Sequence, residues 1–154
     1  MLTILILIGG IEMINSVGAL QTVASQGNIL FSTDRVRTNR SNACCGGWLS
    51  HDLGSGQFTL TNRNCGCSVF EIQFNANLTS ETVSALSLAI RANGENIGGT
   101  EMDYTPAAAN VYESVTASTL VKVPAGSSVT ITVANISASD VIVKDSNIIV
   151  KKIA

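Results

Sequence analysis

The segment from residue 55 to residue 76 constrains the fold of this chain more than any other. Its apolar residues fall at every second position: Phe58, Leu60, Phe70, Ile72 and Phe74. Alternation with a period of two is typical of a strand that buries one face and wets the other. The same pattern returns in three later segments: 86–90, 129–133 and 141–150. The sequence therefore predicts an antiparallel all-β domain, an architecture that suits display better than catalysis.

Composition is consistent with one domain and excludes one class of partner. The chain has 154 residues, of which 45% are hydrophobic and only 13% charged, whereas about 25% charged is usual for soluble domains. This deficit predicts either a polar but uncharged sheet surface or a surface that partners cover. The net charge is −2, and Lys and Arg are scattered. Without a basic stripe, nucleic-acid binding is excluded.

Turn residues divide the alternating segments. Asn93-Gly94 favours a type I′ hairpin turn between a strand at 85–92 and a short strand near 96–102. Pro124-Ala125-Gly126 predicts a second tight turn, with proline setting its first central dihedral angle. Residues 105–110 form a connector between sheets.

The pattern as a whole contains about eight to ten strands, which is the number expected of a two-sheet jelly roll. Shared parity along the strands predicts which side chains form the core. The predicted core consists of Phe58, Leu60, Phe70, Ile72, Phe74, Leu86, Leu88, Ile90, Ile131 and Val133.

The first eleven residues are apolar and uncharged. They are too few for a transmembrane helix, and they lack the basic region and cleavage site of a signal peptide. We predict that residues 1–25 form an arm that anchors the chain to a partner and that residues 26–154 form the domain. The residues expected to make the anchor are Leu2, Ile4, Leu5, Ile6, Leu7 and Ile8. The alternatives are an ordinary strand of the same domain and a vestigial leader before Met13.

Several segments, in this order, resemble the tumour necrosis factor and complement 1q superfamily. The segments are 28–32, 54–60, 70–76, 86–95, 111–124 and 146–150. The resemblance covers about residues 20–154 and implies a ten-stranded jelly roll that assembles as a homotrimer. Four shorter motifs resemble small bacterial and prophage members more narrowly: residues 51–56, 105–108, 123–126 and 133–137. No collagen-like Gly-x-y stalk precedes the domain, so the arm stands in the stalk's place.

The four cysteines form two close pairs, Cys44-Cys45 and Cys65-Gly66-Cys67. The pairs lie at opposite ends of one strand-plus-loop unit, so disulfides that tie the two loops together are one interpretation. A zinc site is another, although the spacing differs from the usual Cys-x-x-Cys knuckles. Reduced, buried thiols are the third.

Other residue types carry little chemistry. His51 is the single histidine and Asp52 adjoins it in sequence, so no catalytic triad is expected, and His51 is interpreted as a loop residue that bonds to the backbone. Trp48 is a candidate sugar-stacking platform, and its alternative role is to cover the cysteine loop. Glu95, Glu101 and Asp103 form a loose acidic group that could hold calcium, although solvated loop charges are the simpler interpretation.

These observations predict a protein that is not an enzyme and uses no cofactor or structural metal. The function expected is structural: a trimeric decoration, head-fibre or spike protein on the surface of a bacteriophage virion. Its partners would be copies of itself, capsid or other virion proteins that the arm contacts, and a host-surface glycan. The alternative is an adhesive head on a bacterial cell or spore surface, in an extracellular location. No membrane span is expected in either case.

Overall fold

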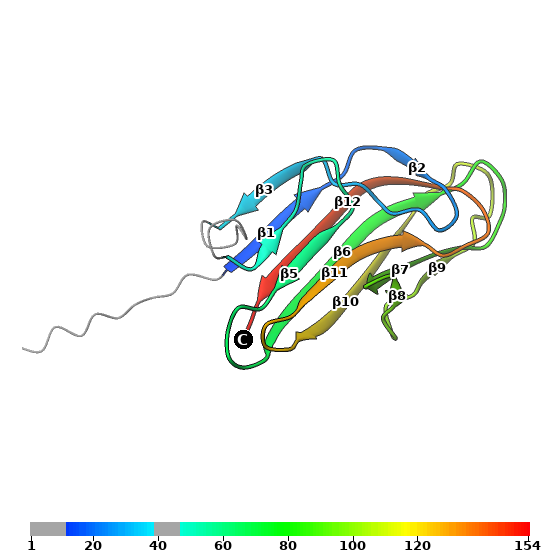
Figure 1. Ribbon diagram of the computed structural model, residues 1–154. Coiled ribbons are helices and arrows are strands. Elements are labelled where there is room, and N and C mark those ends of the chain that lie inside the picture. The colour runs from blue at the N-terminus through cyan, green and yellow to red at the C-terminus, as the bar shows by residue number, and fades with distance from the viewer. Residues whose placement is uncertain (1–11, 39–46) are drawn as a thin grey trace, which may run out of the picture.

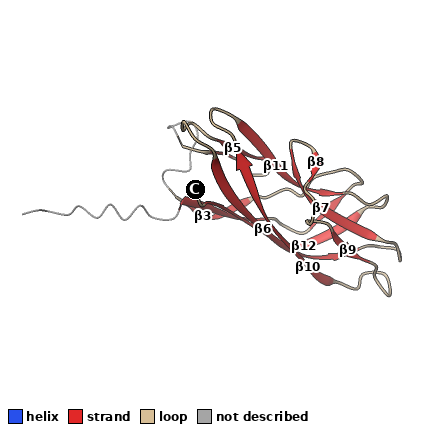
Figure 2. Ribbon diagram, turned by 90° about the horizontal axis from the view of Figure 1, so that it is seen from below, coloured by secondary structure: helices blue, strands red, loops and turns tan. Residues whose placement is uncertain are grey.

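This computed structural model describes residues 12–38 and 47–154 of the chain. These residues contain twelve strands, joined by loops and turns, and no helix. The strands form two antiparallel sheets that lie face to face (Figure 1). Figure 2 shows the sheets as two separate layers. Within the described residues, no helix is long and apolar enough to cross a membrane. The prediction of an all-β jelly-roll sandwich is confirmed.

The first sheet follows the order β10-β6-β12-β1-β3, and β2 pairs with the first residues of β12. Its strands are β1 (Glu12–Val17), β2 (Gln21–Val23), β3 (Thr33–Arg37), β6 (Ser68–Thr79), β10 (Glu113–Val123) and β12 (Val141–Lys152). The long strands β6 and β12 pair with each other and form its centre. A bulge between Lys144 and Asn147 interrupts their register.

The second sheet follows the order β4-β5-β11-β7-β8, and β9 also pairs with β7. Its strands are β4 (Leu49–Ser50), β5 (Phe58–Thr61), β7 (Leu86–Ala92), β8 (Glu95–Asn96), β9 (Met102–Tyr104) and β11 (Ser128–Asn135). The chain changes sheet between β5 and β6, between β6 and β7, and at each step from β9 to β12. Such alternation between two facing sheets defines a jelly roll.

The predicted core is confirmed at all ten positions. Each of those side chains has at most 1% of its surface exposed. Phe31, which lies in the loop before β3, joins them, and its ring meets the rings of Phe58 and Phe74 edge-on at 5.4 Å and 6.4 Å between centroids. Edge-to-face contact is a favoured geometry for aromatic pairs. The core therefore follows from the alternation, completed by a loop residue.

Both predicted turns form. Asn93 and Gly94 have φ values of 50° and 82° and close the hairpin between β7 and β8, as a type I′ turn requires. In the second turn, the Ser127 N–H donates to the Pro124 carbonyl at 3.1 Å. Proline is thus the first residue of the turn rather than its first central residue, one position earlier than predicted.

The predicted boundary at residue 25 is wrong. Residues 12–17 form β1, which lies between β12 and β3 and pairs with both, and β2 follows at Gln21–Val23. Ile14 is fully buried, because alternation in this short strand directs it into the core. The domain therefore includes residue 12 onward. Residues 1–11, with the predicted anchor from Leu2 to Ile8, lie outside the described residues, and anchoring stays a prediction.

A buried asparagine joins the end of β11 to the neighbouring loops. Asn135 is fully buried. Its Nδ2 donates to the carbonyls of Val23 and Ser139 at 3.0 Å and 2.8 Å, and its Oδ1 accepts from the Ser137 N–H at 3.0 Å. Three backbone groups thus depend on one side chain.

Replacing Asn135 by alanine is expected to lower the free energy of unfolding by about 3 kcal/mol, because each of the three bonds contributes about 1 kcal/mol. Urea denaturation measures the change. Asn64→Ala is the control, since Asn64 is exposed and such substitutions usually stay within about 0.5 kcal/mol. Equal stability of the two variants would contradict the assigned role.

Candidate functional site

The cysteines give no bonded site among the described residues. Cys65 and Cys67 lie in the exposed loop between β5 and β6, and neither forms a disulfide with another described residue. Cys44 and Cys45 lie outside the described residues, so disulfides or a zinc site that involve them stay predictions. No three His, Cys, Asp or Glu side chains of the described ranges meet as metal ligands. Glu95, Glu101 and Asp103 therefore do not form a calcium site together.

Trp48 is not a sugar-stacking platform. Only 3% of its surface is exposed, and its ring lies 5.2 Å from the ring of Phe70, on β6. The residue sits immediately before β4, where the chain turns its largest apolar side chain into the sandwich. Removing such a large apolar side chain from water is favourable in free energy, so Trp48 is stabilised in the core. The predicted surface contact at Trp48 is thus corrected to a core contact.

His51 is a structural residue of the loop after β4. Its Nδ1 lies 3.0 Å from the Gln57 carbonyl, which confirms the expected backbone bond, and its ring stacks on Phe58 with 3.9 Å between centroids. Asp34 Oδ1 lies 3.8 Å from His51 Nε2 and also accepts from the Ser16 hydroxyl at 2.9 Å. The carboxylate therefore stands between the serine and the histidine. In a triad the histidine occupies that middle position, so this group lacks the geometry of one.

The outward face of the first sheet carries a row of amide side chains. Asn15 on β1 donates to Asn147 on β12 at 2.6 Å, and Asn147 donates in turn to Asn75 on β6 at 3.2 Å. On β6, Asn77 accepts from the Ser114 hydroxyl of β10 at 2.6 Å. These bonds run across the central strands of the sheet. We call this surface the amide face.

Apolar side chains adjoin the amide face, and charges lie beside it. Ile149 is paired in register with Asn15 and with Gln73, so it lies among the amides. Leu120 on β10 is 61% exposed and Val36 on β3 is 48% exposed. Two carboxylates bond directly to the outer amides of this face: Glu71 accepts from Gln73 at 2.6 Å, and Asp145 accepts from Asn77 at 3.0 Å. A wide surface with neutral amides at its centre and exposed apolar side chains on its edge strands is suited to protein contact.

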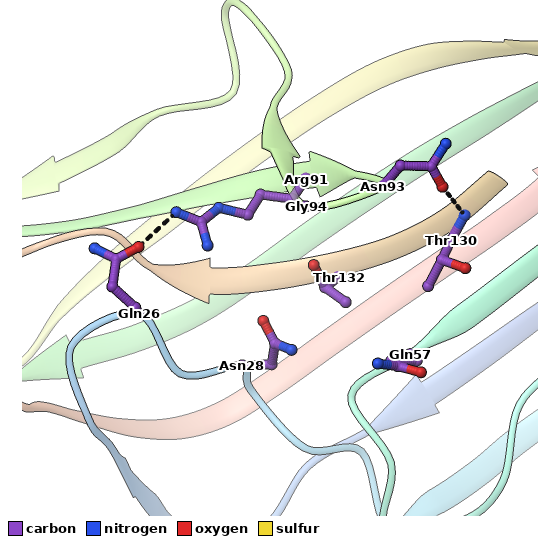
Figure 3. Close-up of a pocket in the computed structure, with 8 residues that line it drawn as sticks. All are labelled: Gln26, Asn28, Gln57, Arg91, Asn93, Gly94, Thr130 and Thr132. Atoms are coloured by element: carbon purple, nitrogen blue, oxygen red, sulfur yellow. Dashed lines mark hydrogen bonds between the residues drawn. The ribbon is translucent and has the colours of Figure 1, made fainter.

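The second sheet carries a polar pocket on its outward face, with a volume of about 380 Å³. Thr130 and Thr132 of β11 form its floor, and the turn from β7 to β8 forms one wall (Figure 3). The opposite wall comes from the loop before β3 and from Gln57. The full lining is Gln26, Asn28, Gln57, Arg91, Asn93, Gly94, Thr130 and Thr132. Sequence reasoning missed this pocket because its residues come from four separate segments.

Solved structures of low sequence identity share this architecture. Murine APRIL matches with a TM-score of 0.65 at 9% identity, over 94% of this chain and all of that one. Eiger TNF from S. frugiperda matches with a TM-score of 0.63 at 11% identity, over 94% and 93%. The globular domain of zebrafish complement 1qA matches with a TM-score of 0.61 at 10% identity, over 94% and 97%. This chain has the tumour necrosis factor and complement 1q jelly-roll fold.

These matches confirm the jelly-roll fold that the sequence resemblance implied. The narrower resemblance to bacterial and prophage proteins stays a prediction. No protein-family model matches the sequence, and no significant relative was found among curated proteins. Because identities near 10% establish the fold alone, function has to be argued from the surfaces of this chain.

Proposed function

We propose that this chain is a non-enzymatic display protein that assembles as a homotrimer through the amide face of its first sheet. The observation that carries the proposal is the amide face itself: the hydrogen-bonded neutral amides of Asn15, Asn147 and Asn75 lie at its centre, and Leu120 and Val36 are exposed on its edge strands. Surfaces of protein contacts are depleted of charge at their centre. The chain's low charge, 13% of residues, agrees with a partly covered surface.

In a closed trimer, the amide face of every copy contacts a neighbouring copy. Side-chain amides carry both donors and acceptors, so the same surface can pair with a neighbouring copy. Cyclic symmetry closes such contacts into a ring and avoids an open fibre. The jelly-roll fold, shared with tumour necrosis factor-like and complement 1q domains, supports this assembly.

The proposed location is the surface of a bacteriophage virion, where the trimer decorates the capsid. Support comes from the sequence resemblance and from the place where the chain enters the sheet. Glu12, the first residue of β1, pairs with Lys152 near the end of β12, so residues 1–11 precede the domain at that end. An apolar, β-branched segment there can add a strand to a capsid protein. The loops at the far end then stay free for contact with a host.

Replacing Ile149 by aspartate is expected to dissociate the trimer, because three buried carboxylates would lack partners. Sedimentation of the unmodified chain should give a species near three times 16.0 kDa, and the variant a monomer. Val83→Asp is the matched control, since Val83 is 60% exposed in the loop after β6. A monomer of the unmodified chain, independent of concentration, would refute the trimer.

The virion location needs its own test. Mass spectrometry of purified particles from a strain that carries this gene should detect the chain in a fixed ratio to the capsid protein. Detection only in the cell-surface or spore-coat fraction would reject the virion role and leave the trimer intact.

A further inference from the structure

We infer that the pocket on the second sheet binds a carboxylated sugar unit, such as a uronate or a sialate. The inference deepens the proposed display function by naming a ligand class. The lining residues lie on the outward face of the second sheet and in the loops beside it, away from the amide face. Binding therefore does not depend on the trimer, and the two proposals can fail separately.

Arg91 supplies the positive charge of the pocket. Among the described residues of the lining it is the only ionised side chain, and none of them is a carboxylate that would neutralise it. Its Nε donates to Asn96 at 2.7 Å, and its Nη2 donates to Gln26 at 2.8 Å. These two bonds hold the planar fork, and the remaining N–H groups of its five are left to bind a ligand. A fixed guanidinium is suited to bidentate recognition of a carboxylate.

Thr132 is the second, independent feature. Only 8% of this residue is exposed, and its hydroxyl has no hydrogen-bond partner in the described part of the chain. Figure 3 shows the side chain between Arg91 and Asn28, at the floor of the pocket. Solvent still reaches the hydroxyl oxygen, so this group is open to a ligand that enters the pocket. A ligand hydroxyl or carboxylate placed beside Arg91 would satisfy it.

Amides complete the lining and select a polyhydroxylated ligand. The side chains of Asn28 and Gln57 make no hydrogen bond among the described residues, and both reach the pocket from the side opposite Arg91 (Figure 3). Asn93 uses its Oδ1 to accept from the Thr130 N–H at 2.9 Å, which leaves its Nδ2 free to donate. Neutral amides of this kind match the alternating donors and acceptors of sugar hydroxyls.

Gly56 allows two segments to pack closely and form the wall of the pocket that carries Asn28 and Gln57. A Cβ at Gly56 would lie 2.5 Å from the Ile29 carbonyl oxygen and 3.0 Å from the Asn28 Cβ. Only glycine therefore lets the segment before β5 lie against the loop that carries Asn28. That contact places Gln57 and Asn28 on one side of the pocket.

The balance of charge favours a carboxylate over a phosphate. The described lining contains one cation and no second Lys or Arg, so it compensates a single negative charge. Size is consistent with one sugar unit, since 380 Å³ lies at the small end of the range of about 300–1,000 Å³ for ligand pockets. A ligand of this size is expected to bind with a Kd on the order of 1 mM.

The test is an NMR titration of the full ¹⁵N-labelled chain with methyl glucuronide, methyl sialoside, neutral methyl glucoside, acetate and inorganic phosphate. Either acidic glycoside should shift the backbone amides of Arg91, Asn93 and Thr132. Neutral glucoside, acetate and phosphate should each bind at least about tenfold more weakly, because each lacks either the single charge or the hydroxyls. Neutral glucoside binding as tightly as the acidic sugars, tighter binding of phosphate, or no shift with either acidic sugar would overturn the inference.

Variants of the pocket make the site assignment specific. Arg91→Gln keeps a long polar side chain but removes the charge, and should weaken binding of the acidic sugar by about tenfold or more. Thr132→Val removes only the hydroxyl and should weaken it about threefold to tenfold. Lys122→Gln changes the net charge equally from the exposed surface of β10 and should leave binding unchanged. An equal loss with Lys122→Gln would indicate unspecific attraction and reject the site.

Testing two variants also separates a loss of binding from a loss of folding. Arg91 bonds to two neighbours, so its replacement could disturb the turn, whereas valine is nearly isosteric with threonine and suits a strand. If Arg91→Gln does not fold, Thr132→Val alone decides: unchanged affinity would reject the pocket. Sedimentation of the same samples records whether the trimer persists.

Discussion

Replacing Phe74 by alanine is expected to lower the free energy of unfolding by about 3–5 kcal/mol, the usual effect of removing a buried ring. Phe74 lies on β6, which pairs with both β10 and β12, and only 1% of the side chain is exposed. Its loss would leave a cavity beside Phe31, which it meets at 6.4 Å between ring centroids. Neighbouring strands cannot close that space without giving up their register.

Urea denaturation at one fixed protein concentration measures this effect, because association contributes to apparent stability. Val83→Ala is the matched control: it removes apolar atoms from a residue that is 60% exposed and should shift stability by less than about 0.5 kcal/mol. A midpoint of Phe74→Ala that equals that of the unmodified chain would show that this ring is not part of the core.

Deletion of residues 1–17 is expected to abolish the cooperative fold. The deletion removes β1, which pairs with β12 over six residues and with β3 on its other side. It also removes Ile14 from the core. The backbone groups of both neighbours would then lose their partners, and an open edge on β12 would be free to aggregate. Circular dichroism during thermal unfolding measures the loss.

Deletion of residues 1–11 is the matched control and should leave the thermal midpoint close to that of the full chain. The same shorter variant should fail to incorporate into particles if these residues are the anchor. Failure of this variant to fold would instead make them an integral part of the domain and reject the anchoring role. Normal incorporation would reject that role while leaving the fold as described.

Core residues could be predicted from the sequence because the signal is local. Ile72 and Phe74 are two residues apart, and a strand places such neighbours on one face whatever lies opposite. Burial of that face is then the only favourable choice for apolar side chains. The Asn93-Gly94 turn was predictable for the same reason, since two adjacent residues suffice to favour positive φ values.

The strand at residues 12–17 was missed because its own pattern is short and polar. Asn15 and Ser16 interrupt the apolar positions, and the uncharged run that precedes them carries a stronger local signal. Pairing with β3 on one side and with β12, more than a hundred residues later in the chain, on the other stabilises this segment as a strand. Trp48 was misjudged in a similar way, because its neighbour Phe70 belongs to a strand that local reasoning could not place beside it.

By itself, the sequence determined the fold class and the parity of the core strands, because alternation and turns are read from adjacent residues. Only the tertiary structure decided which outward-facing polar residues meet. The amide row of Asn15, Asn147 and Asn75 joins three strands. The pocket brings Arg91 and Thr132 together with the loop that carries Asn28. Such groups depend on strand order and register across the whole chain, and burial of the core, rather than any local signal, sets both.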